Sequence, residues 1–70
     1  MRQVLLYQDE DGGWIAEVPS LPGCHSDGDT RDETLLNVQE AIALWIEDAD
    51  AHGEAIPDDY TNMVVVPVSA

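Results

Sequence analysis

The feature that most constrains the fold is one long amphipathic segment that begins at Thr30. Thr30 and Glu33 match a capping box, in which the threonine hydroxyl accepts from the Glu33 amide and the glutamate carboxylate reaches back to Thr30. His52-Gly53 has the composition of a helix C-terminus. Between these ends, apolar residues recur at helical spacing, at Leu35, Val38, Ile42, Trp45 and Ala49. The pattern predicts a helix from residue 30 to about residue 52 that buries one face.

The 29 residues before Thr30 leave room only for short strands. Residues 3–8 are rich in strand formers, and residues 14–18 alternate, with Trp14, Ala16 and Val18 on one face. The acidic, glycine-containing stretch 9–13 between them predicts a hairpin turn. The two prolines in residues 19–23 predict a loop, and residues 24–28 then form a short third strand with Cys24, Ser26 and Gly28 on one face.

After the helix, residues 56–59 form a connection and residues 63–68 predict a final strand that is apolar on both faces. Pro67 places this strand at an edge or end of the sheet. The expected order is β-β-β-α-β, an α+β fold in which one helix packs on a small antiparallel sheet. A chain of 70 residues is expected to be one domain, spanning residues 1–70.

The charge balance limits the possible partners. With 15 acidic residues, two arginines and no lysine, the formal net charge is −13. Such a chain cannot neutralise phosphates by itself, so we expect no direct binding to nucleic acid or to an anionic membrane. The 44% apolar content nevertheless indicates a folded domain. A charged partner is therefore expected to be basic.

Cysteine content and targeting signals indicate the compartment. The single Cys24 cannot form an intramolecular disulfide, and no signal peptide or membrane span is recognisable. We therefore expect a cytoplasmic protein without a cofactor. Neighbouring residues of an extended segment point to opposite faces, so Cys24 and His25 do not form a catalytic dyad. The carboxylates fall in small separate groups and predict no metal site.

The residues from Asp9 to Cys24, DEDGGWIAEVPSLPGC, closely resemble the HicB-like antitoxin family. The match continues through Gly28-Asp29-Thr30, the helical Glu40-Ala41-Ile42 and the exit Gly53-Glu54-Ala55-Ile56-Pro57, and covers roughly residues 3–58. The resemblance implies a fold similar to a truncated ribonuclease-H-like domain. Many family members add a C-terminal DNA-binding module, whereas only about a dozen residues follow Pro57 here, so autoregulation of transcription is not expected.

The resemblance also implies a function. HicB-like antitoxins bind and mask a small, basic, RNA-cleaving toxin of the HicA type, and a −13 surface is complementary to such a partner. For the contact surface we predict the acidic turn and its neighbouring tryptophan: Asp9, Glu10, Asp11 and Trp14.

Two other functions stay open at this stage. The chain could be an orphan homo-oligomer, structural or small-ligand-binding, or a divalent-metal nuclease, which would need converging carboxylates. Left as a free edge, the two-sided apolar strand would invite aggregation, so we expect a partner strand or a second subunit to cover one side of it. We therefore predict a homo-oligomer, a dimer or tetramer, with this interface: Met63, Val64, Val65, Val66, Val68 and Leu44.

Overall fold

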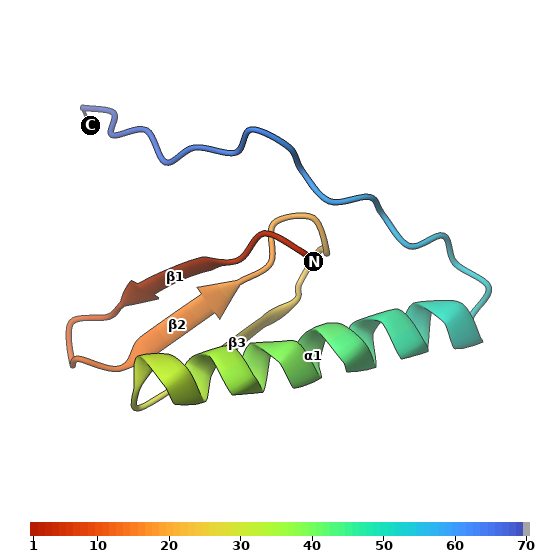
Figure 1. The fold of residues 1–70 in the computed structure, drawn as a ribbon, viewed down its shortest axis with the longest axis horizontal. Coiled ribbons are helices and arrows are strands. Elements are labelled where there is room, and N and C mark those ends of the chain that lie inside the picture. The colour runs from red at the N-terminus through yellow and green to blue at the C-terminus, as the bar shows by residue number, and fades with distance from the viewer. Residues whose placement is uncertain (70) are drawn as a thin grey trace.

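The computed structural model describes residues 1–69 and contains three strands followed by one helix (Figure 1). Its elements in chain order are β1 (Leu5–Gln8), β2 (Trp14–Glu17), β3 (His25–Gly28) and α1 (Arg31–Ala51). The strands lie in the sheet in the order β1-β2-β3, and both neighbouring pairs are antiparallel. The α+β class, with three antiparallel strands before a single helix, is confirmed.

The register of the sheet separates a buried face from an open one. Ala16 lies opposite Leu6 of β1 and Ser26 of β3, and it is completely buried. Val38 of α1 is also buried and packs into the same cluster. α1 therefore covers one face of the sheet, where it contacts β3 and β2. The core consists of Ala16, Val18, Leu21, Cys24 and Val38.

The loop between β2 and β3 closes one end of this core. Backbone hydrogen bonds from Leu21 to Val18 (3.1 Å) and from Cys24 to Leu21 (3.0 Å) fold it into consecutive turns. These turns direct the Leu21 side chain inward, where it is fully buried. The indole Nε1 of Trp45 donates to the Pro22 carbonyl at 2.9 Å, which ties the loop to α1. The proline loop thus belongs to the core although it contains no strand.

The helix ends follow the predicted caps with one difference. The Thr30 hydroxyl accepts from the Glu33 amide at 3.1 Å, as predicted. The Glu33 carboxylate, however, accepts from the amide of Asp29 at 3.4 Å and not from that of Thr30. At the other end, the His52 amide donates to the Asp48 carbonyl, and Gly53 takes a φ of +68° that favours glycine.

The predicted strand at residues 63–68 is wrong for the chain as described. Residues 63–69 form no ladder, and the sheet within the described residues has three strands. Beyond α1 the chain turns back and runs in the same direction as β1 (Figure 1). A strand exists only through hydrogen bonds to a neighbour, and this segment has made none with β1. Its valines remain in solvent, with Val65 81% and Val68 82% exposed.

Candidate partner-binding surface

Asp9 organises the acidic turn between β1 and β2. Its Oδ1 accepts from the amides of Asp11 (2.9 Å) and Gly13 (3.0 Å), while its own amide donates to the Gly13 carbonyl at 2.8 Å. Gly12 has a φ of +87°, which a residue with a side chain rarely adopts. A Cβ at Gly13 would lie 3.2 Å from the Asp9 carboxylate. Asp9 is therefore occupied in holding the turn, a role that sequence reasoning did not assign to it.

Glu10 and Asp11 are exposed at the tip of this turn. Because the sheet is antiparallel, the β1–β2 turn and the β3–α1 junction lie at the same end of the molecule, as Figure 1 shows. At that junction Asp32 and Glu33 occupy the first turn of α1, where the positive end of the helix dipole stabilises them. We call this surface the acidic end; it comprises Asp9, Glu10, Asp11, Asp29, Asp32 and Glu33.

Trp14 begins β2 directly after the turn but does not project with Glu10 and Asp11. It lies opposite Gln8 in β1 and Gly28 in β3, and it is half-buried. It shares its face with Ala16, which is the face that α1 covers. The structure therefore brings the three acids together and sets Trp14 on the inner side of the sheet.

Within residues 1–69 no helix or strand covers the opposite face of the sheet, and sequence reasoning did not single out this face. All three strands contribute side chains to this face: Leu5, Tyr7, Ile15, Glu17, His25 and Asp27. The Tyr7 hydroxyl donates to the Glu17 carboxylate at 3.1 Å, and this hydrogen bond raises the pKa of Tyr7. The predicted order of elements could have revealed this uncovered face, because a single helix can cover only one face of a three-stranded sheet.

The predicted interface residues are placed as follows. Val64, Val65, Val66 and Val68 are exposed, and Met63 is half-buried. Leu44 lies on the solvent side of α1 and is 65% exposed. Their role in self-association stays a prediction.

The described residues include few other side chains that could bind a metal ion or act in catalysis. Within residues 1–69, no three His, Cys, Asp or Glu side chains are grouped so that they could hold a metal ion. Cys24 is buried, and this burial raises the pKa of its thiol, while the charge of Arg2 acts in the opposite direction. His25, the next residue, is exposed, so the two do not form a pair. No helix of the described chain combines the length and apolarity needed to cross a membrane.

The described residues thus form a small α+β domain with an acidic end and one sheet face that the helix does not cover. Comparison with known proteins gives the class: the model of the HicB-like antitoxins of bacterial toxin–antitoxin systems matches residues 3–66. The chain belongs to this family.

Relatives and a solved structure agree with that assignment. A UPF0150 protein of Thermoplasma acidophilum is 43% identical over 63 residues, covering 90% of this chain and 91% of the relative. A UPF0150 protein of Synechocystis is 44% identical over 66 residues, covering 94% and 81% respectively. The crystal structure of the N-terminal domain of the Burkholderia pseudomallei antitoxin HicB superposes with a TM-score of 0.75 at 30% identity. That match covers 83% of this chain and 69% of the other.

Proposed function

We propose that this protein is a non-enzymatic antitoxin that binds and masks a small basic RNA-cleaving toxin of the HicA type in the cytoplasm. Membership of the HicB-like family supports an antitoxin role. The net charge of −13 supports a basic partner, because complementary charge accelerates encounter and suppresses wrong partners. We also propose that the protein forms a homo-oligomer, a dimer or tetramer, because its valines at 64–66 and 68 are exposed.

The observation that carries the proposal is the acidic end. Glu10 and Asp11 stand exposed on a turn that the Asp9 carboxylate fixes through two hydrogen bonds. A turn that is already fixed loses little conformational entropy when it binds. Its carboxylates are therefore preorganised to bind arginine or lysine side chains. Trp14 is retained as a proposed contact at the edge of this surface, because a half-buried tryptophan can still present part of its ring.

The test reverses charge at the tip while leaving the turn intact. Asp9 is unsuitable because its loss would remove the hydrogen bonds that shape the turn. Glu10→Lys with Asp11→Lys changes the charge by four, and within residues 1–69 neither carboxylate accepts a hydrogen bond that the change would remove. Glu40→Lys with Glu47→Lys is the matched control, since it makes the same charge change at two exposed positions of α1.

Binding to a purified HicA-type toxin, supplied as a catalytically inactive variant, is measured at several salt concentrations. The turn variant is expected to bind about tenfold more weakly than the control at low salt and to show a flatter salt dependence. Equal affinities and equal salt slopes for the two variants would reject the acidic end as the contact surface. No binding by the unaltered protein would reject the antitoxin function itself.

A further inference from the structure

A pocket lies at one end of the sheet face that α1 does not cover, at the end remote from the acidic turn. Its volume is about 300 Å³. The strands contribute Leu5, Glu17 and His25, which lie side by side because Leu5 pairs with Glu17 and Glu17 pairs with His25. The loop between β2 and β3 forms the rest of the wall and includes Pro19 and Pro22. The pocket therefore combines apolar walls with polar side chains from the sheet.

Glu17 supplies the pocket with its carboxylate, and the lining includes no lysine or arginine. The Tyr7 hydroxyl donates to Glu17 Oε1 at 3.1 Å, which orients this carboxylate. Within residues 1–69, no cationic side chain forms an ion pair with Glu17. A carboxylate can accept at about four lone-pair sites, and Tyr7 uses one of them. The Glu17 carboxylate is thus held in place while most of its capacity to accept hydrogen bonds is unused.

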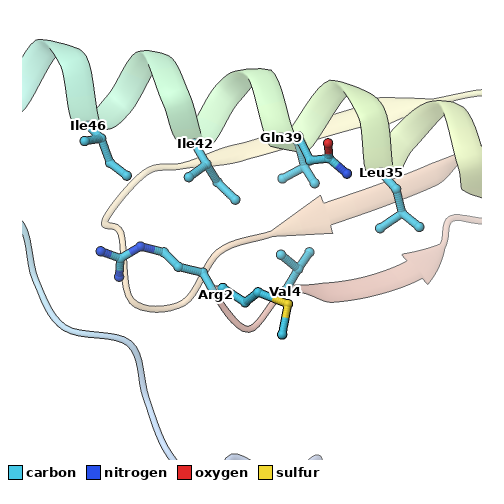
Figure 2. Close-up of a pocket in the computed structure, with 8 residues that line it drawn as sticks. Arg2, Val4, Leu35, Gln39, Ile42 and Ile46 are labelled. Atoms are coloured by element: carbon cyan, nitrogen blue, oxygen red, sulfur yellow. The ribbon is translucent and has the colours of Figure 1, made fainter.

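A second cavity has the opposite chemistry. An apolar groove of about 620 Å³ lies between α1 and the segment that leads into β1, and Figure 2 shows its helix side chains directed toward Arg2 and Val4. Asp59 Oδ2 accepts from the Gln3 amide at 2.9 Å and so anchors the chain that follows α1 to this segment. The groove lining includes no carboxylate, and Arg2 is positively charged. A cationic side chain would meet a like charge in the groove, whereas the pocket beside Glu17 offers it an opposite charge.

We propose that the pocket receives one arginine side chain of the basic partner, with its guanidinium bound to Glu17; this inference rests on the proposed antitoxin function. Arginine is favoured over lysine because a guanidinium presents paired N–H donors that match the two oxygens of a carboxylate. It is also planar and weakly hydrated, so it can lie against the rings of the prolines and of His25. The volume is at the lower limit for ligand pockets, about 300–1,000 Å³, which suits a single side chain.

One partner can contact this pocket and the acidic end together. Glu17 is the last residue of β2 and Trp14 is the first, so Glu17 lies only about 10 Å from the strand end that follows the acidic turn. Asp27, on the neighbouring β3, adds a further carboxylate to the same face between the two sites. Negative charge alone attracts many basic proteins, whereas a pocket shaped for one side chain distinguishes among them.

The test compares four variants that share a net charge of −12 (−13 + 1). Glu17→Gln removes the charge of the pocket but keeps an oxygen that can accept from Tyr7. His25→Arg places a guanidinium of the chain itself directly opposite Glu17, where it competes with the arginine of the partner. The matched controls are Glu40→Gln and Ala43→Arg, which make the same charge changes at exposed positions of α1.

Binding of each variant to a catalytically inactive HicA-type toxin is measured by calorimetry. Each pocket variant is expected to bind about tenfold more weakly than its control. Replacing the arginines of the toxin one at a time by glutamine is expected to reveal one arginine that is coupled to Glu17. Its loss should weaken binding to the unaltered protein about fivefold more than binding to the Glu17→Gln variant. If the unaltered protein binds but the pocket variants match their controls, or if no arginine is coupled to Glu17, the pocket proposal is overturned and the antitoxin function stands.

A second measurement needs no toxin. N-acetyl-arginine amide is titrated into the unaltered protein, and the amide resonances of Glu17 and His25 are expected to shift in NMR spectra as the pocket fills. N-acetyl-citrulline amide, which has nearly the same shape without the charge, is expected to shift them less. The Glu17→Gln variant is expected to respond weakly to both compounds. Equal responses of the unaltered protein to the two compounds, or no response to either, would overturn the proposal even if the protein bound no toxin.

Discussion

Gly28, the last residue of β3, packs closely against Thr34 in the first turn of α1. A Cβ built on Gly28 would lie 2.7 Å from Thr34 Oγ1 and 3.1 Å from its amide nitrogen. Thr34 is fully buried, and its hydroxyl donates to the Thr30 carbonyl at 2.7 Å, so it cannot easily move away. Only a glycine at position 28 allows the helix to begin this close to the sheet.

Gly28→Ala is therefore expected to destabilise the protein by about 1–3 kcal/mol, as overpacking does in other cores. Denaturant unfolding measures the loss. Without the clash, alanine in a strand would be neutral or slightly stabilising relative to glycine. A double-mutant cycle with Thr34→Ala isolates the contact, and a coupling free energy of at least 0.5 kcal/mol, roughly the threshold for residues in contact, is expected. A fully additive cycle would contradict this account.

The two ends of α1 are unequally matched to the helix dipole. The first turn contains Asp32 and Glu33, which the dipole favours, but the last turn contains acidic residues and no lysine or arginine. Asp50→Lys is expected to stabilise the protein by about 0.3–1 kcal/mol. Asp32→Lys gives the same net charge of −11 (−13 + 2) but is expected to destabilise it.

Thermal unfolding of the two variants, recorded side by side, separates the dipole from the overall charge. If both variants gained stability equally, relief of the net negative charge would explain the result and the position along the helix would not matter.

The anchor at Asp59 is expected to depend on pH. Burial raises the pKa of Asp59, but the amide of Gln3 and further groups, Arg2 among them, more than offset this and hold the pKa below its usual value. A lowered pKa means that the folded chain favours the carboxylate. The anchor therefore contributes stability above the ordinary pKa of aspartate and loses it as the pH falls through the lowered value.

The amide resonance of Gln3, followed by NMR through an acid titration, is expected to shift with a midpoint below the usual aspartate value. Asp59→Asn keeps an acceptor oxygen and is expected to abolish the transition. Asp58→Asn, at the exposed neighbouring position, is expected to leave it in place. A transition that survives Asp59→Asn would assign the shift to another group.

Local signals in the sequence were enough to predict most of the elements. The Thr30 hydroxyl caps the helix as its position predicted, because capping depends on residues only three apart. The alternation in 14–18 correctly placed Ala16 and Val18 on the buried face, since side-chain direction in a strand is fixed by parity. The placement of Glu33 against Asp29 was missed, because a one-residue shift of a flexible carboxylate leaves no trace in the pattern.

The acidic end was only half predictable. The cluster Asp9-Glu10-Asp11 is plain in the sequence, but its division into a turn-forming Asp9 and two free carboxylates depends on backbone geometry. The approach of Asp32 and Glu33 to the same end follows from the antiparallel order of the strands.

By itself, the sequence determined the class of fold, the single capped helix and the acidic character, because these depend on composition and on neighbours a few residues apart. Tertiary structure alone decided which apolar residues remain uncovered. Residues 63–68 have the composition of a strand, yet they pair with nothing in the described chain while an apolar groove stands open beside β1. The reason is physical: a helix is closed by its own hydrogen bonds, whereas a strand depends on a neighbour that only the folded arrangement can supply.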